Sequence, residues 1–163
     1  MKRGFIGLLA LPFVATSLAF AAHHEGKVEY PTEYRDWTHV KTLTLLENHP
    51  FAETFGGIHH VYANDIALEA LKNGSPYPDG AVLVFDLFEV ALDAEGGTSG
   101  EGARIRKDVM QKNAELWAET GGWGYETFFG ADNERIITDP IGSCHACHLG
   151  AEETDFVFSQ YRK

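Results

Sequence analysis

Basic residues are scarce in this sequence, which has 13 lysines and arginines against 24 aspartates and glutamates and a formal net charge of −11. A surface this acidic repels polyanions. The charge balance therefore argues against nucleic acid and against anionic lipid as a partner. It does not indicate which partner is the right one.

Long apolar runs are absent after residue 21. Before that point the sequence looks like a secretory signal peptide, with basic residues at positions 2 and 3, an apolar core over 5–20 and the small-x-small pattern Ala19-Phe20-Ala21. We expect residues 1–21 to be removed on export, and residues 22–163 to form a single periplasmic domain that does not span the membrane. The alternative is an uncleaved N-terminal anchor.

Cysteine occurs only twice, and both copies lie in the stretch Ser143-Cys144-His145-Ala146-Cys147-His148. The pattern is C-x-x-C-H, the attachment signature of a c-type haem. Two intervening residues let both sulfurs reach one porphyrin edge, and the following histidine can bring its ring under the iron. The sequence therefore predicts one covalently attached haem c, held by Cys144 and Cys147 and ligated by His148 as the proximal metal ligand.

A zinc site or a redox dithiol is the alternative interpretation of the same stretch. A structural zinc site needs four converging ligands, and adjacent residues such as Cys147 and His148 rarely close one tetrahedron. The lack of any other cysteine and the export signal favour haem. His145, between the two cysteines, is expected to face solvent.

Methionine is also rare, and none follows Cys147. Small electron-carrier cytochromes have the haem motif near the start of the chain and a methionine ligand well downstream, so this sequence does not fit that type. A four-helix cytochrome with its motif near the end does not fit either, because residues 39–46 and 81–90 are typical of strands. A mainly β domain with a C-terminal haem remains.

Hydrophobic periodicity and turn residues predict the remaining elements. Asn64 is a good N-cap and Gly74 a good stop, so the clearest helix is expected over 65–73. Its apolar face would hold Ile66, Ala67, Ala70 and Leu71. Strands are expected over 39–46, 58–63, 81–90, 104–113 and 123–129, a helical turn over 34–37, a short helix over 114–119, and loops over 47–55 and 93–102.

Five short segments accompany the haem motif. They are Tyr34-Arg35-Asp36-Trp37, Val61-Tyr62, Asp79-Gly80 before a hydrophobic strand, Trp123-Gly124 and Thr154-Asp155-Phe156-Val157-Phe158. Together with the motif they resemble the cytochrome P-460 family, over nearly all of the chain after the signal peptide. The resemblance implies an α+β, mainly β fold: a compact antiparallel sheet with a few short helices and a C-terminal c-type haem site, assembled as a homodimer.

The resemblance also implies one of two activities, because the family has two branches. Cytochromes P-460 proper oxidise hydroxylamine and carry, at one strand position, a lysine bonded to the porphyrin. Cytochromes c′-β bind small gases at a five-coordinate haem and have a phenylalanine there, which caps the distal iron face with a second aromatic residue. Matching the segment from Asp79 to Val84 to the family pattern places Phe85 at this position. Phe55 is the candidate for the second aromatic, and Phe51 is the fallback.

A distal face lined by Phe55 and Phe85 would offer no hydrogen-bond donor to bound oxygen and no lone pair to the sixth coordination position. Nitric oxide or carbon monoxide loses little there, whereas hydroxylamine needs proton acceptors during its oxidation. The sequence therefore favours a gas-binding haem protein of the c′-β branch, which scavenges or senses nitric oxide. Plain core packing is the alternative role for both phenylalanines.

Two other functions stay open at this point. One is a hydroxylamine or nitrogen-oxide oxidoreductase, and the other is a simple electron-transfer cytochrome with a redox protein partner. Whether the protein is an enzyme is thus undecided by the sequence.

Other polar residues are weaker candidates for the haem site. His59 and His60 point to opposite faces of their predicted strand, so at most one can approach the iron. Glu126 could act as an acid or base on the distal side, or could be a paired carboxylate. Arg135 and Arg162 could each pair with a haem propionate, and the sequence does not choose between them.

Overall fold

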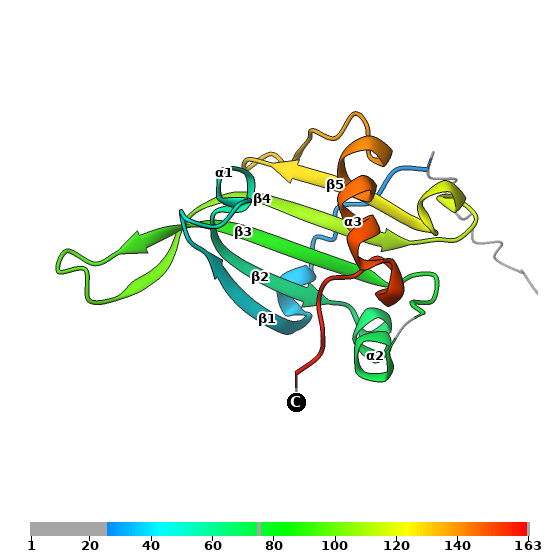
Figure 1. The fold of residues 1–163 in the computed structure, drawn as a ribbon, viewed down its shortest axis with the longest axis horizontal. Helices are drawn as coiled ribbons and strands as arrows, with labels where there is room; N and C mark the ends of the chain where they lie inside the picture. Colours follow the sequence, from blue (N-terminus) through cyan, green and yellow to red (C-terminus); the bar gives the residue numbers. More distant parts are fainter. Residues whose placement is uncertain (1–25, 75, 163) are drawn as a thin grey trace, which may run out of the picture.

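A six-stranded antiparallel sheet forms the body of the protein (Figure 1). The computed structural model describes residues 26–74 and 76–162, so the predicted signal peptide lies outside the described residues. The strands are β1 (Thr38–Leu45), β2 (Gly57–Ala63), β3 (Val82–Leu92), β4 (Ser99–Lys112), β5 (Trp123–Phe129) and β6 (Glu134–Arg135). They pair in chain order, so neighbours in the sequence are neighbours in the sheet. The prediction of a mainly β, antiparallel fold is confirmed.

The helical segments are short. They are η1 (Tyr34–Asp36), α1 (Ala52–Phe55), α2 (Asp65–Asn73), η2 (Ala118–Thr120), η3 (Ile141–His145), α3 (Ala146–His148) and η4 (Leu149–Thr154). The last three follow one another and form the C-terminal helical segment, residues 141–154. Within the described part of the chain, no helix is long and apolar enough to cross a membrane.

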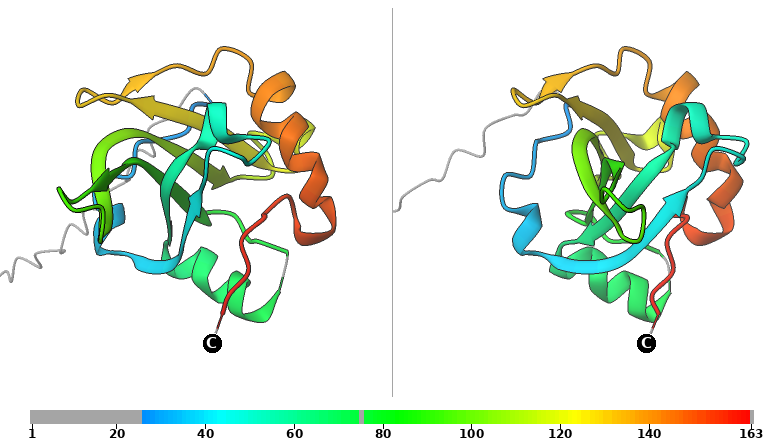
Figure 2. Two further views of the ribbon diagram at one scale, coloured as in Figure 1. Left: turned by 60° about the vertical axis from the view of Figure 1, so that its left-hand side comes forward. Right: turned by 90° about the vertical axis from the view of Figure 1, so that its left-hand side faces the viewer.

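The curved sheet is covered on both faces by different parts of the chain (Figure 2). On the motif face, α2 and the C-terminal helical segment pack on the sheet; on the N-terminal face, residues 28–37 do. The buried cluster of the motif face includes Ala67, Leu71, Leu83, Trp123, Tyr125 and Val157. The cluster of the N-terminal face comprises Val28, Tyr34, Tyr62, Val84, Val109 and Phe128. Both faces of β3 are therefore buried or half-buried from Val82 to Phe88, as expected for a central strand, while residues 89–92 are exposed.

Helix α2 confirms the prediction over 65–73 residue for residue. The Asn64 side chain accepts hydrogen bonds from the Ala67 amide at 2.9 Å and the Val82 amide at 3.1 Å. It therefore caps the helix and also ties the helix to β3. One detail of the predicted apolar face is wrong, because Ile66 is 43% exposed and Leu68 is buried in its place. The orientation of α2 on the sheet decides which side of its apolar face is buried.

Three loop or helix predictions are wrong in part. The predicted loop over 93–102 is shorter, because β3 and β4 stay paired as far as Leu92 and Ser99 in a projecting hairpin (Figure 1). The predicted loop over 47–55 ends in α1. Residues 114–117 form a turn instead of a helix, since the Asn113 side chain accepts hydrogen bonds from the amides of Glu115 and Leu116.

A buried carboxylate joins the N-terminal segment to the sheet on the N-terminal face. Asp86 of β3 is fully buried and accepts hydrogen bonds from the Tyr34 hydroxyl at 2.7 Å, from Arg35 at 3.1 Å and from Arg104 at 2.8 Å. Burial, followed by the hydrogen bond to Asp86, raises the pKa of the Tyr34 hydroxyl far above its ordinary value. Asp86 is thus the structural anchor of this face.

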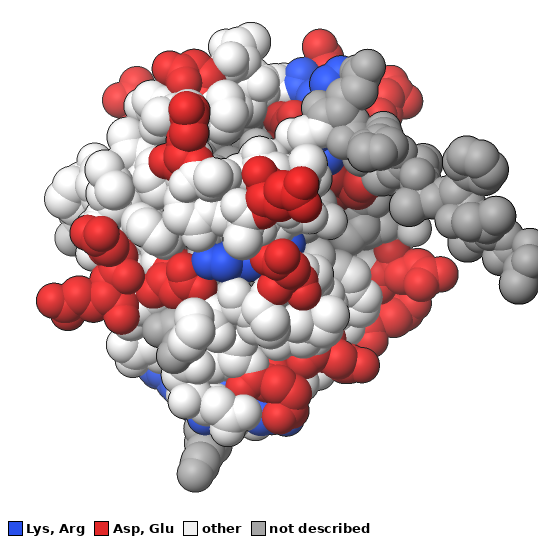
Figure 3. Space-filling model, turned by 90° about the vertical axis from the view of Figure 1, so that its right-hand side faces the viewer, with Lys and Arg blue, Asp and Glu red and all other residues white. Residues whose placement is uncertain are grey.

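Among the charged side chains in the view of Figure 3, red acidic groups are widely spread and blue basic ones are few. This distribution follows from the net charge of −11. It fits the expectation that polyanions are poor partners.

Candidate functional site

The C-x-x-C-H stretch lies in the C-terminal helical segment, which crosses the motif face of the sheet (Figure 1, orange to red). Cys144 and Cys147 are both unpaired thiols, one partly buried and one exposed. A spacing of three residues puts them on one side of a helical turn. Cys144 packs against the buried cluster of the motif face. Burial raises the pKa of its thiol, and the nearby charge of Asp108 raises it further.

The imidazole of His148 has a fixed orientation. Its Nδ1–H donates to the carbonyl oxygen of Phe156 at 2.7 Å, and its ring lies 5.1 Å from the Tyr125 ring and 5.2 Å from the Phe158 ring, centroid to centroid. Burial lowers the pKa of His148, which favours the neutral ring. With Nδ1 committed to a carbonyl, Nε2 keeps its lone pair, as an iron ligand requires.

His145 does not face solvent, so that prediction is wrong. It is 8% exposed, its ring lies 5.0 Å from the Phe156 ring, and its Nδ1 lies 3.4 Å from the Tyr125 hydroxyl. The helical turn directs the residue after Cys144 back toward the sheet, and the sequence pattern alone does not show this.

The two predicted cap residues meet on the motif face. Phe55 ends α1 and Phe85 lies in the middle of β3, and their rings pack edge to face with centroids 6.3 Å apart. Both rings remain partly exposed. Phe51, the fallback, is 59% exposed and packs on His49. The structure therefore brings together the pair Phe55 and Phe85 and leaves Phe51 outside it.

The surroundings of this pair are not purely apolar, contrary to the expectation from sequence. Asp108 of β4 is the register partner of Phe85, so both lie on the motif face. Its carboxylate accepts from the Thr127 hydroxyl at 2.6 Å and from Arg106 Nε at 3.1 Å. The Arg106 guanidinium in turn lies 4.8 Å from the centre of the Phe55 ring. Arg106 and Asp108 are two residues apart on β4, so the alternation of side chains along a strand could have placed them on the same face. The interpretation of the sequence missed this signal.

His59 stands behind the aromatic pair. It is 1% exposed, its ring centroid is 4.3 Å from that of Phe85, and its Nε2–H donates to the carbonyl oxygen of Phe55. Its Nδ1 has no hydrogen-bond partner among the described residues. Burial lowers the pKa of His59 to about 4. The ring thus joins the end of α1 to β3 as a neutral imidazole.

His60 lies on the opposite face of β2, as predicted. Its Nδ1 lies 2.8 Å from the Thr42 hydroxyl and its Nε2 lies 2.8 Å from a carboxylate oxygen of Glu101. Nδ1 is thus within hydrogen-bond distance of Thr42, while Nε2 is close to Glu101 without hydrogen-bond geometry, and both contacts lie away from the motif face. The two histidines therefore lie on opposite faces of the sheet, and His59 is the one on the motif face.

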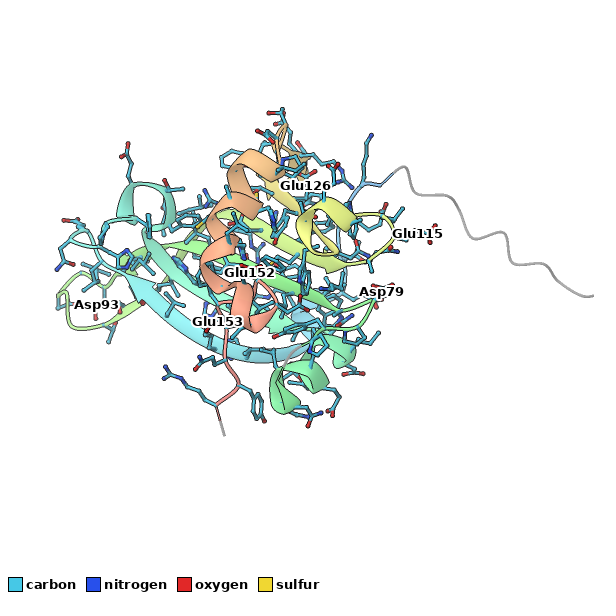
Figure 4. All side chains as sticks on the ribbon, turned by 45° about the vertical axis from the view of Figure 1, so that its right-hand side comes forward. Asp79, Asp93, Glu115, Glu126, Glu152 and Glu153 are labelled. Atoms are coloured by element: carbon cyan, nitrogen blue, oxygen red, sulfur yellow. The ribbon has the colours of Figure 1, made fainter. Side chains whose placement is uncertain are left out.

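Glu126 of β5, labelled in Figure 4, is the register partner of Val109 and so belongs to the N-terminal face, and its carboxylate is fully engaged. It accepts from Arg135 at 3.1 Å and from the amides of Thr127 and Ile137 at 3.0 and 3.2 Å. Of the two roles considered, the paired carboxylate is the one the structure supports. Arg135 is correspondingly occupied, and its guanidinium also lies 4.9 Å from the centre of the Phe128 ring.

Arg162 lies near Lys41, a partly buried residue on the β1 edge of the motif face. Burial lowers the pKa of Lys41, and the positive charge of Arg162 lowers it further. Among residues 26–74 and 76–162, neither cation forms an ion pair with a carboxylate. On this face Lys41 and Arg162 thus differ from Arg106 and Lys112, which are paired with carboxylates.

The C-x-x-C-H stretch and its surroundings supply the groups that a haem requires. A neutral imidazole with a committed Nδ1 and two unpaired cysteines at a spacing of three supply one axial ligand and two thioether positions. The partly exposed rings of Phe55 and Phe85 supply apolar surface on the same sheet face. Within the described residues, no group of three or more histidine, cysteine, aspartate and glutamate side chains could hold a metal ion by itself. The residues fit a haem, and the arrangement is that of a haem-binding domain.

Comparison with known proteins agrees with this class. The model of the Cytochrome P460 family matches residues 31–159. The chain therefore belongs to the Cytochrome P460 family, which makes it a haem protein. No curated protein matches the chain.

Proposed function

We propose that this protein is a periplasmic monohaem c-type cytochrome of the c′-β type, with haem bonded to Cys144 and Cys147. When bound, the haem supplies an iron that is held by one protein ligand and can take a small gas such as nitric oxide. His148 is that ligand. The proposal depends on a single observation, the edge-to-face contact of Phe55 and Phe85 on the sheet face that the motif segment covers.

The aromatic side chains on the motif face support gas binding because they can form neither a porphyrin cross-link nor a further bond to iron. Phe85 stands where cytochromes P-460 proper have their cross-linking lysine, and a phenyl ring cannot form that bond. The Phe55 and Phe85 rings offer no nitrogen or sulfur as a further ligand. His59 has its Nε2 committed to the Phe55 carbonyl, which keeps this imidazole in place as a support for the cap.

Lys41 and Arg162 are the proposed partners of the haem propionates. Both lack a carboxylate partner among the described residues, whereas Arg135 is held by Glu126. Partly buried propionates need cationic partners. Arg162 is therefore preferred over Arg135 for this role.

The test is the optical spectrum of the purified ferrous holoprotein, with and without nitric oxide. We expect a high-spin, five-coordinate spectrum that changes on addition of the gas. A six-coordinate, low-spin spectrum without added ligand would overturn the proposal and favour a simple electron-transfer cytochrome. Colourless protein from cells that assemble c-type cytochromes would contradict both.

A second candidate function, oxidation of hydroxylamine or a related nitrogen compound, is favoured by Asp108. Its carboxylate lies on the motif face opposite Phe85 and can accept a proton, which such a reaction requires. The test is turnover of hydroxylamine with an artificial electron acceptor by the parent protein and by Asp108→Asn. Turnover that is lost in Asp108→Asn would establish this function over gas binding. Mass spectrometry of the haem peptide would show whether any residue besides the two cysteines is bonded to the porphyrin.

Export and assembly complete the proposal. The signal peptide of residues 1–21 delivers the chain to the periplasm, and the folded domain forms a homodimer. N-terminal sequencing of the exported protein is expected to begin at Ala22, and sedimentation analysis is expected to give twice the monomer mass. The redox partner, if one is used, would be a separate protein.

A further inference from the structure

Two successive residues after the haem motif adopt an unusual backbone conformation. Asp155 and Phe156 have φ angles of 53° and 65°, in the left-handed region. This region is uncommon for residues with a Cβ atom, and for a bulky residue such as phenylalanine it is a clear outlier. Such conformations persist only where the surrounding structure holds them, so the contacts of this turn identify what it is for.

Lys112 of β4 is the main contact that holds the turn. Its Nζ donates to the two carboxylate oxygens of Asp155 at 2.7 and 2.9 Å and to the carbonyl oxygen of Gly121 at 2.8 Å. The lysine side chain is only 9% exposed. The Asp155 carboxylate also accepts from the Tyr77 amide at 2.8 Å, and the Asp155 carbonyl accepts from Trp123 Nε1 at 2.8 Å. The Asp155 amide donates to the Glu152 carbonyl at 3.0 Å, so every polar group of Asp155 has a partner.

The turn fixes Phe156 in a single position. The Phe156 amide donates to the Ala151 carbonyl at 2.8 Å, and its ring packs so closely on Gly121 that a Cβ there would lie 2.3 Å from the ring. In this position the Phe156 carbonyl oxygen is the acceptor for Nδ1–H of His148, at 2.7 Å. A continuous series of contacts therefore leads from Lys112 of β4, through Asp155 and Phe156, to the imidazole of His148.

We propose that the Lys112–Asp155 ion pair is a positioning device for His148. By holding the turn in its left-handed conformation it keeps the Phe156 carbonyl in line with Nδ1–H, which fixes the ring and increases the basicity of Nε2. Lys112 and Asp155 are positioning residues that touch neither iron nor gas. This inference rests on the proposed function, in which His148 is the axial ligand.

The experiment compares Asp155→Ala with the parent in the ferrous holoprotein, by resonance Raman spectroscopy of the iron–histidine stretch and by potentiometric titration. A loosened turn weakens the hydrogen bond to Nδ1, so the stretch moves to lower frequency. The less basic ligand favours the ferrous state by about tenfold, about 59 mV upward for a one-electron couple. Asp155→Asn keeps an acceptor and tolerates the left-handed conformation, so it should restore most of the parent frequency.

Asp86→Ala is the matched control. Like Asp155, Asp86 is a carboxylate that binds cationic side chains, but it is fully buried and lies on the N-terminal face. Its removal should lower stability and leave the iron–histidine stretch and the potential unchanged. A shift in Asp155→Ala no larger than the shift in Asp86→Ala would overturn the proposal, because the effect would then be general loosening.

Failure of the positioning role and failure of the proposed function give different results. If the parent shows no iron–histidine band in the ferrous state, His148 is not the sole axial ligand and both ideas fall. If the parent band is present and Asp155→Ala leaves it unmoved, only the positioning role is wrong. Should Asp155→Ala not fold, Lys112→Gln replaces it, and an unmoved band in that variant overturns the positioning role.

Discussion

The two faces of the central strands β3 and β4 differ in what closes them. On the N-terminal face, Val84, Asp86 and Val109 are fully buried beneath residues 28–37, and the buried Asp86 carboxylate is held by a tyrosine and two arginines. On the motif face, Phe85 and Asp108 stay partly exposed between α1 and the C-terminal helical segment. Because side chains alternate along a strand, adjacent residues belong to the buried core on one face and to the candidate site on the other.

Replacing both cysteines is the change expected to have the largest effect, and it acts on the motif face alone. In Cys144→Ser with Cys147→Ser, the thioether bonds cannot form, so all of the haem should be extractable by acidified organic solvent. Absorbance of the extracted and retained fractions measures this. Haem that stays with the double variant after extraction would contradict covalent attachment through these residues.

Removing the anchor of the other face should mainly affect stability. Asp86→Ala leaves Arg35 and Arg104 without their buried partner, and breaking such a buried pair costs about 3 kcal/mol in the free energy of unfolding. Urea denaturation measures the loss. The ferrous spectrum should match that of the parent, and a changed spectrum would show that the two faces are coupled.

Burial of His59 on the motif face should make the stability of the protein sensitive to acid. Its pKa is about 4 in the folded protein and about 6.5 when unfolded, so the unfolded chain binds more protons between these values. The free energy of unfolding is unaffected by His59 above pH 6.5. It decreases as the pH falls from 6.5 toward 4, by up to about 3 kcal/mol in total. His59→Gln should flatten this part of the stability profile measured by urea denaturation. A slope equal to that of the parent would remove His59 as its source.

Phe85→Ala should change gas access with a smaller cost in stability. Opening the cap is expected to raise the association rate of nitric oxide or carbon monoxide several-fold, while the partly buried ring accounts for about 2 kcal/mol of stability. Flash photolysis measures the rate. Covalent haem attachment should be unaffected.

Phe51→Ala is the control for this effect and the smallest change of the series. The Phe51 ring is 59% exposed and lies outside the cap pair, so stability should stay within about 0.5 kcal/mol of the parent and gas rates should not change. Equal rates in Phe85→Ala and Phe51→Ala would mean that Phe85 has only a packing role.

Local sequence signals predicted the elements that depend on short-range interactions. The helix over 65–73 follows from its cap residues, and the strand over 123–129 from its aromatic residues and flanking glycines. The predicted boundaries were wrong where an element is held by pairing with residues farther along the chain. The hairpin of β3 and β4 extends through a glycine-rich stretch because strand pairing supplies the hydrogen bonds that local propensity does not predict.

The candidate site divides in the same way. The spacing of Cys144, Cys147 and His148 is a local pattern, and the meeting of Phe55 with Phe85 was expected from a family resemblance. Asp108 beside Phe85, and the burial of His145, depend on strand register and on the direction of the motif helix. Neither can be read from residues close in sequence.

The sequence by itself determined a mainly β domain, one well-defined helix and a haem motif near the C-terminus, because caps, periodicity and motif spacing act over a few residues. Only the tertiary structure decided which groups surround that motif. Asp155, next to the Phe156 carbonyl that binds His148, pairs with Lys112 43 positions away, and Asp86 binds a tyrosine 52 positions away. Contacts at such separations form only when the sheet brings the strands together, so they depend on register and twist more than on local preference.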